Sequence, residues 1–447
     1  MTMKMQTPTL DQMQRVSLLD AMLWRRSRRF APGMNLPSGP LAFQSNRAPS
    51  PLREEEEAAL AFAACGVTGY ALAELPYGPS ALPESAGGHI MTHFVARTIA
   101  SGDAMHDCTL FVLNDSGTWM LKRPQDYVRD DIPELIRCAR EKQLLELYEK
   151  TRVKIADSRV DVPRQVPFVA PFNKWMANVP GTTYFLPVAE LSALYVNVML
   201  SVFDEDFLSF VVDDRNGYQP AGVAAFARSA GGTLCDDPAL GRILTVSSIE
   251  TWICEFVAIE QGAIHQNLGL MCAALGLGGF PHFAAHPFAW QLALGFRMED
   301  VSFNQLAGAA PGSSSDTGVP TAVGLEHAGE VLLQPFCPPY YRNMEEAVLA
   351  FLDYKYATGR GTLRDGGAIT GWADGAAVQA AIPRYSDKAV EATIAYCSYV
   401  YERYGRFPVC SGPFRTVLAF QAHRIDPDFY ARFYRKDAIG DATIRDE

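Results

Sequence analysis

Four arginines and a serine lie close together near the start of the chain, and they are the side chains best suited to chemistry. The segment reads Arg25-Arg26-Ser27-Arg28-Arg29. The planar guanidinium fork of arginine and the hydroxyl of serine match the oxygens of a phosphate monoester. The cluster therefore predicts an anion-binding site. The alternative is a solvated basic helix end that pairs with the acidic run at residues 54–57, which we expect to be the solvated start of another helix.

A second polar group precedes an apolar segment. Arg97, Ser101, Gly102 and Asp103 come before residues 109–114, which are typical of a buried strand. An ionised aspartate accepts hydrogen bonds but cannot donate them. The group is suited to contact the polar edge of a ligand, and the alternative is an ordinary serine- and aspartate-rich turn.

A long apolar helix is expected to position these groups. Apolar residues recur at helical spacing over residues 247–275, and the helix is apolar on more than one face. A glycine-rich segment at residues 276–279 ends it, and Pro281 disfavours a restart. We expect Gly278 or Gly279 to adopt a positive φ. The alternative is a core helix with a glycine stop.

These features together resemble one enzyme family. The run GAIHQNLGLMCAALGLG, which begins at Gly262, resembles the central helix of the nitroreductase-like flavoenzymes. Those enzymes begin with an Arg-Arg-Ser-x-Arg motif that grips the FMN phosphate, which is similar to the cluster at 25–29. The polar group before the strand resembles the segment that contacts the flavin pyrimidine in the azoline-oxidase branch. Two departures are the early aromatic Phe30 and Ala100 in place of a proline.

The resemblance covers residues 20–300 and implies a set of residues that hold FMN. The phosphate would be held by Arg25, Arg26, Ser27 and Arg29, with Arg406 as a further contact. The polar edge of the ring would be contacted by Arg97, Ser101, Gly102 and Asp103. The edge of the isoalloxazine would be covered by Phe283 and Ala284.

The resemblance also implies a fold and an assembly. The fold would be α+β and nitroreductase-like: an antiparallel-dominated sheet flanked by helices, with a long buried central helix near a homodimer interface. Residues 1–300 would form the flavin-binding domain, and residues 301–447 a C-terminal elaboration. This last third opens with small and polar residues at 306–318 and contains a tyrosine-rich helical segment at 386–404. We expect it to form either a lid over the site or an arm around the partner subunit.

Composition narrows the classes of partner. The 447 residues are 48% hydrophobic and 20% charged, and the net charge of -11 argues against nucleic acid or an anionic membrane surface as the main partner. No apolar run is long enough to cross a bilayer, and the N-terminal segment lacks the apolar stretch of a secretory signal. Nine cysteines without a CxxC pair indicate reduced thiols and a cytoplasmic protein. The expected partner is a small-molecule substrate.

Other groups carry weaker signals. His282 and His286 have the spacing of a helical metal pair, but Pro281 and Pro287 bracket them, so no metal site is predicted. Cys410 carries no more signal as a nucleophile than any loop cysteine. No residue stands out as a general acid or base, so the catalytic residues stay unknown.

The sequence thus predicts an FMN-dependent oxidoreductase. It would transfer a hydride to or from flavin N5 and act on a specialised organic substrate. The alternative is a flavin-free nitroreductase-like scaffold that serves as a binding or non-redox module.

Overall fold

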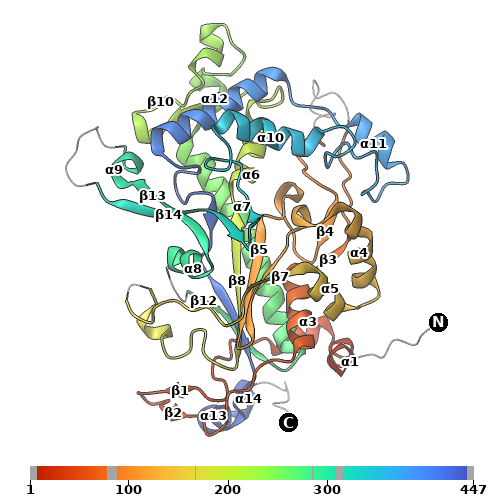
Figure 1. Cartoon of the computed structure of the whole chain (residues 1–447), viewed down its shortest axis with the longest axis vertical. Helices are drawn as coiled ribbons and strands as arrows, with labels where there is room; N and C mark the ends of the chain where they lie inside the picture. The colour runs from red at the N-terminus through yellow and green to blue at the C-terminus, as the bar shows by residue number, and fades with distance from the viewer. Residues whose placement is uncertain (1–7, 78–87, 167, 284–285, 309–315, 440–447) are drawn as a thin grey trace.

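The computed structural model describes residues 8–77, 88–166, 168–283, 286–308 and 316–439 (Figure 1). The described residues form a mixed α+β structure whose sheets are mostly antiparallel, which confirms the α+β class and the antiparallel character of the expected sheet. Among these residues, no helix combines the length and the apolar character needed to cross a membrane.

The largest sheet in the described part of the chain has seven strands, all paired antiparallel. Its order is β12-β17-β8-β5-β6-β7, and β16 also pairs with β8. Its strands are β5 (Cys108–Asn114), β6 (Gly117–Leu121), β7 (Arg152–Ala156), β8 (Thr182–Glu190), β12 (Gly278–His282), β16 (Phe414–Arg415) and β17 (Ala419–His423). Every residue of β5 and β8 is buried, as expected for central strands covered on both faces. The late strand β17 lies between β8 and β12, so the last third of the chain contributes to the main sheet.

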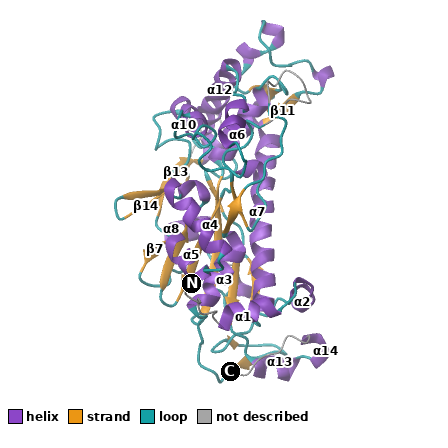
Figure 2. Cartoon of the chain, turned by 90° about the vertical axis from the view of Figure 1, so that its right-hand side faces the viewer, coloured by secondary structure: helices purple, strands orange, loops and turns teal. Residues whose placement is uncertain are grey.

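The predicted central helix is confirmed as α7, Val246–Ala274. Thr245 caps its first turn, because its hydroxyl accepts a hydrogen bond from the Ser248 amide at 3.0 Å. One face carries buried apolar side chains such as Ile253, Val257 and Leu268. Figure 2 shows α7 along one side of the molecule, with the sheet and most of the other helices on its inner side.

The remaining described helices surround the sheet. They are α1 (Pro8–Arg15), α2 (Leu18–Trp24), α3 (Glu54–Cys65), α4 (Ile132–Arg140), α5 (Leu144–Thr151), α6 (Ser192–Phe203), α8 (Pro287–Ala293), α9 (Phe303–Leu306), α10 (Met344–Tyr356), α11 (Gly375–Ala381), α12 (Asp387–Tyr404), α13 (Pro427–Phe433) and α14 (Lys436–Ile439). Smaller sheets contain β1 (Asn35–Leu36) with β2 (Phe43–Gln44), β3 (Val67–Tyr70) with β4 (Val95–Arg97), β10 (Gln219–Pro220) with β9 (Phe210–Asp213) and β11 (Ile243–Thr245), and β13 (Phe296–Ser302) with β14 (Gly318–His327) and β15 (Glu330–Leu333).

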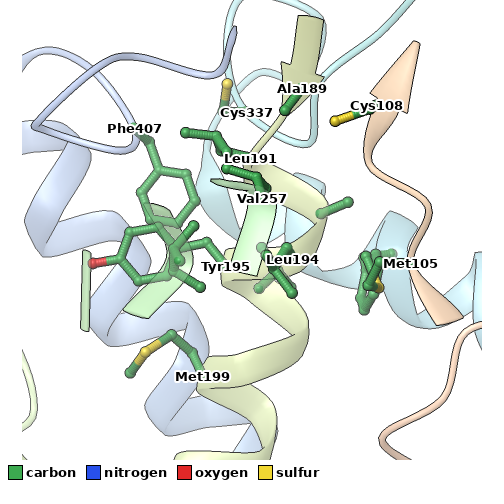
Figure 3. Close-up of a cluster of buried hydrophobic side chains, with 14 of the residues drawn as sticks. Met105, Cys108, Ala189, Leu191, Leu194, Tyr195, Met199, Val257, Cys337 and Phe407 are labelled. Atoms are coloured by element: carbon green, nitrogen blue, oxygen red, sulfur yellow. The ribbon is translucent and has the colours of Figure 1, made fainter. Parts of the chain in front are cut away.

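The upper part of the core joins α6 and α7 to the last third of the chain. Tyr195 of α6 stacks on Phe407 with ring centroids 4.5 Å apart, and its hydroxyl lies 2.6 Å from that of Tyr396 of α12. Figure 3 shows Tyr195 and Phe407 packed beside Leu191 and Val257. At the opposite end, Phe30 stacks on Phe429 of α13 at 4.2 Å, so early and late residues share a small core below the sheet (Figure 1).

Candidate functional site

The arginine cluster lies directly after α2, beside a pocket. Arg25, Arg26, Ser27 and Arg29 are exposed, whereas the Arg28 side chain is buried and donates to the Ile439 carbonyl at 2.9 Å. The pocket has a volume of about 460 Å³, and its wall includes Arg26, Ser27, Arg28, Arg29, Trp175 and Tyr430. A pocket with a basic, hydroxyl-bearing rim and aromatic walls suits an anionic ligand that also carries an apolar part.

The acidic run does not neutralise this cluster. Glu54 pairs with Arg152 at 2.5 Å, and Glu56 pairs with Arg53 and Arg424 at 2.8 Å each. Glu55 accepts from the Thr9 hydroxyl, and Glu57 accepts from Asn114 and Thr183. Within the described residues no carboxylate forms an ion pair with Arg25, Arg26 or Arg29. The alternative pairing with residues 54–57 is therefore wrong.

The acidic run is also less exposed than expected. Glu56 and Glu57 are buried, with 1% and 3% of their surfaces exposed, so the prediction of a fully solvated helix start is wrong. Hydrogen bonds from Asn114 and Thr183 offset part of the cost of burying Glu57. Desolvation still raises the pKa of Glu57.

Arg25 and Arg29 reach different neighbours from those of Arg26. Arg26 turns back and donates to the Leu23 and Arg25 carbonyls, both at 2.9 Å, at the end of α2. The Arg25 side chain lies against α7, where its Cδ would be 3.7 Å from a Cβ at Gly269. The Arg29 guanidinium lies over the Phe280 ring of β12, 5.2 Å from its centroid. Arg25 and Arg29 thus flank the junction of α7 and β12.

Two buried histidines lie near this junction, on opposite faces of the main sheet: His265 stacks on Phe420, whereas His282 lies beside Tyr184. His265 lies on α7, one turn before Gly269, and His282 ends β12. Burial lowers the pKa of His265 to about 4. Burial, with the nearby Arg29 charge and His265, lowers the pKa of His282 to about 3. Both imidazoles are therefore neutral at pH 7.

Several polar atoms at this junction have no hydrogen-bond partner in the described part of the chain. They are His265 Nδ1, both ring nitrogens of His282 and the Tyr184 hydroxyl. The Tyr184 ring lies edge-on to His282 at 5.5 Å. An unsatisfied buried polar group costs about 1–3 kcal/mol. Atoms of this kind favour a ligand that hydrogen-bonds to them; those of His282 and Tyr184 share one face of the sheet, and His265 Nδ1 lies on the other.

The glycine turn that leads to this junction differs from the prediction. Positive φ occurs at Gly276 (70°) and at neither Gly278 nor Gly279. The last two are in β12, paired with His423 and Ala422 of β17. They are needed for space, because a Cβ would lie 2.5 Å from the His423 ring at Gly278 and 2.7 Å from Cys272 Sγ at Gly279. Pro281 and His282 also belong to β12, so the strand continues to the residue before Phe283.

The residues expected along the flavin edge lie just past β12. Phe283 is exposed, and its carbonyl accepts a hydrogen bond from the Asn173 amide. Ala284 lies outside the described residues. His286 is exposed and does not belong to a group of three possible metal ligands; the one such group found among the described residues is Glu134, Cys138 and Glu146. Arg137 pairs with both of those glutamates.

The polar segment that begins at the end of β4, residues 97–103, contacts α7 at a different position from the arginine cluster. Arg97 is buried and donates to the Cys65 carbonyl at 2.6 Å and to the Cys108 carbonyl at 3.0 Å. The Ser101 hydroxyl accepts from the His106 amide at 2.8 Å. A Cβ at Gly102 would lie 3.4 Å from the Phe256 ring. The segment therefore contacts the outer face of α7, with Arg97 held inside the protein.

Asp103 has a buried lysine, Lys355, as a neighbour. The sequence analysis did not identify Lys355 as a candidate site residue. Asp103 has a φ of 55°, and desolvation raises its pKa to about 6, against the opposing effect of Lys355. Lys355 of α10 is buried, and its Nζ donates to Asn197 Oδ1 at 2.8 Å and to the Tyr385 hydroxyl at 3.3 Å. Desolvation lowers the pKa of Lys355 well below its usual value. The available signal was a lysine between two tyrosines, Tyr354 and Tyr356, at the end of that helix.

The structure places the predicted residues at three separate positions along α7. Arg25 lies at Gly269 and Gly102 lies at Phe256, 13 residues earlier, which corresponds to about 20 Å of helix. Arg406 lies near the start of α7, where it donates to the Val409 carbonyl at 2.7 Å. A ligand bound by one chain at the arginines therefore does not touch all three groups.

Comparison with known proteins adds no family. No protein-family model matches the chain, and no curated protein matches it.

Proposed function

We propose that this protein is an FMN-dependent oxidoreductase of nitroreductase-like fold that acts on a small organic substrate. The observation that carries the proposal is the set of exposed arginines, without a carboxylate partner in the described structure, beside a pocket with aromatic walls. Arg29 lies over Phe280, whose ring is 4.9 Å from that of His282, a residue with two ring nitrogens left unsatisfied within the described residues. FMN combines the two features that such a place suits, a dianionic phosphate and a polar heterocycle.

Different residues of this chain would bind different parts of FMN. Arg25 and Arg29 supply permanent positive charge to the phosphate, and the Ser27 hydroxyl can donate to a phosphate oxygen. His282 and Tyr184 on one face of the main sheet, and His265 on the other, offer neutral hydrogen-bonding groups in buried places, where such bonds are stronger than in water. When bound, FMN supplies the hydride chemistry, and the protein orients it and excludes water.

The arginines and the Gly102 segment of one chain are too far apart to contact the same ligand. This separation supports a homodimer in which two chains share the site. Gly262 and Ala263 lie midway between Phe256 and Gly269 on α7, and a Cβ at Gly262 would meet nothing within 4 Å. If two copies of α7 cross antiparallel at this midpoint, Phe256 and the Gly102 segment of one subunit approach Gly269 and Arg25 of the other. The proposed FMN site is then shared between the subunits, as the resemblance implies.

Exposed apolar side chains support the same assembly. Trp252, Phe256 and Ile259 of α7 are exposed, and α2 packs against the second half of α7. The exposed side chains of α2 are also apolar: Leu18, Leu19, Met22 and Leu23. A two-fold axis at Gly262 brings the first half of one α7 toward α2 of the other copy. An apolar stripe of this kind is a mark of a protein interface.

Equilibrium binding of FMN, followed by quenching of its fluorescence, tests the proposal. Losing one arginine from a charge-assisted contact should cost about 1.5–3 kcal/mol, or roughly tenfold to a hundredfold in affinity. We expect that loss for Arg25→Ala and for Arg29→Ala. Arg297→Ala is the matched control, because Arg297 is a half-exposed arginine that pairs with Glu299 on β13.

Two outcomes would contradict the proposal. Unchanged FMN affinity in both variants would remove the arginines from the site. A wild-type protein that binds no FMN would instead favour the flavin-free scaffold.

A further inference from the structure

Two of the nine cysteines differ from the rest in their surroundings. Seven are buried, whereas Cys254 is partly exposed and Cys410 is exposed. Cys254 lies on α7, and Cys410 lies in the segment that joins α12 to β16. Their Sγ atoms are 3.7 Å apart, although 156 residues separate them in sequence. A disulfide bond requires about 2.0 Å between the sulfurs, so a small movement of side chains suffices.

Glu250 fixes the backbone that presents Cys410. Its carboxylate accepts hydrogen bonds from the Val409 amide at 2.6 Å and from the Cys410 amide at 2.8 Å. Glu250 lies one turn before Cys254 on α7, so both residues face the same segment. The buried hydrogen bonds of Glu250 thus hold the two thiols facing each other.

The charges around Cys254 favour its thiolate. Either thiol can donate in the contact between Cys410 and Cys254, and Arg415 Nη1 donates to Cys254 Sγ at 3.6 Å. The Cys410 contact lowers the pKa of Cys254 to about 7, with a further contribution from Arg415 and an opposing one from Glu250. The same contact raises the pKa of Cys410, as does burial. Cys254 is therefore the nucleophile of the pair, since the thiolate is the reactive form.

We propose that Cys254 and Cys410 form a redox-active dithiol that reacts with low-molecular-weight disulfides. The Cys254 thiolate attacks one sulfur of the disulfide, forms a mixed disulfide and releases one thiolate. Cys410 loses its proton and attacks Cys254 Sγ, which forms the Cys254–Cys410 bond and releases the second thiolate. Two protein thiols are oxidised by two electrons, and one small disulfide is reduced to two thiols. The new bond fastens α7 to the segment that follows α12.

Treatment of the native full-length protein with oxidised glutathione tests the site. After the remaining thiols are blocked, digestion without reductant and mass spectrometry should yield one linked peptide pair containing Cys254 and Cys410, which dithiothreitol separates. Cys410→Ser should retain glutathione on Cys254. Cys254→Ser should lose most of the reaction at Cys410. Cys235→Ser, a change at a buried thiol, should behave like the wild type.

A second measurement needs no cysteine variant. On the native wild-type protein at pH 7, iodoacetamide should modify Cys254 roughly tenfold faster than an ordinary thiol. Arg415→Gln should slow that reaction, and Arg415→Lys should restore part of it. Recovery of both thiols unmodified after oxidised glutathione would overturn the proposal, as would a linked peptide that contains a different cysteine. Glutathione found on Cys410 with Cys254 free would overturn the assigned order of attack.

Discussion

At the scale of residues, arginines supply the positive charge of the candidate site, and neutral histidines supply hydrogen-bonding groups. His265 and His282 stay neutral at pH 7, because burial holds their pKa values at about 4 and about 3. The positive charge comes from the guanidinium groups of Arg25 and Arg29. Sequence spacing could not show that His265 and His282 lie close to the same helix–strand junction, on opposite faces of the sheet. Their placement depends on the reversal of the chain at Gly276, which brings β12 back along α7.

Buried neutral histidines make the protein sensitive to acid. His93 is an example outside the candidate site: it is buried, and desolvation lowers its pKa to about 4, with help from Arg97 and Arg123. An unfolded histidine has a pKa near 6.5. Between pH 6.5 and 4 the unfolded state therefore binds a proton that the folded state does not. The free energy of unfolding decreases as the pH falls through this range.

The change His93→Asn should remove this part of the acid sensitivity. An asparagine oxygen can replace Nδ1 as acceptor for the Val95 amide and does not titrate. Between pH 7 and pH 5 the wild type should lose about 2 kcal/mol more of its free energy of unfolding than the variant. Urea unfolding at the two pH values measures the difference, and the exposed His286→Asn is the control. Equal losses in wild type and His93→Asn would contradict the assignment.

At the scale of elements, α7 was predictable because its signals are local. The helical spacing and the glycines after residue 274 lie within one stretch of chain. The role of each glycine was not predictable, because it depends on β17, whose residues lie about 140 positions later.

Gly276 ends α7 in a motif that requires a left-handed residue. The Leu277 amide donates to the Cys272 carbonyl at 2.8 Å, and the Gly276 amide donates to the Ala273 carbonyl at 3.2 Å. We expect Gly276→Ala to lower the free energy of unfolding by about 1–2 kcal/mol, and Gly276→Asn to lower it by less, because asparagine tolerates this conformation. Chemical denaturation measures both. An alanine variant as stable as the wild type would show that the turn does not need a positive φ.

At the scale of the whole molecule, the last third of the chain is part of the structure that holds the site. It supplies β17 to the main sheet and places α12 against α6. Its tyrosines were visible in the sequence as a helical segment. Their burial against α6, including the contact between Tyr195 and Tyr396, could not be read from spacing alone. The boundary at residue 300 stays a prediction.

The proposed dimer depends on the outer face of α7. Ile259 is 65% exposed and lies one turn from the midpoint at Gly262, so Ile259→Arg should place two charges in the interface and separate the subunits. Light scattering after gel filtration should report twice 49.1 kDa for the wild type and 49.1 kDa for the variant. Leu349→Arg on α10 is the control, because Leu349 is an exposed leucine far from that midpoint in sequence and on a different helix. A monomeric wild type would contradict the proposal that the FMN site is shared between two subunits.

The flavin content of the purified protein tests the central claim most directly. Its visible absorption spectrum should show oxidised flavin, and denaturation should release FMN in a ratio near one per chain. Protein that loses its flavin during purification should recover the spectrum after FMN is added. A colourless protein that takes up no added FMN would contradict the account.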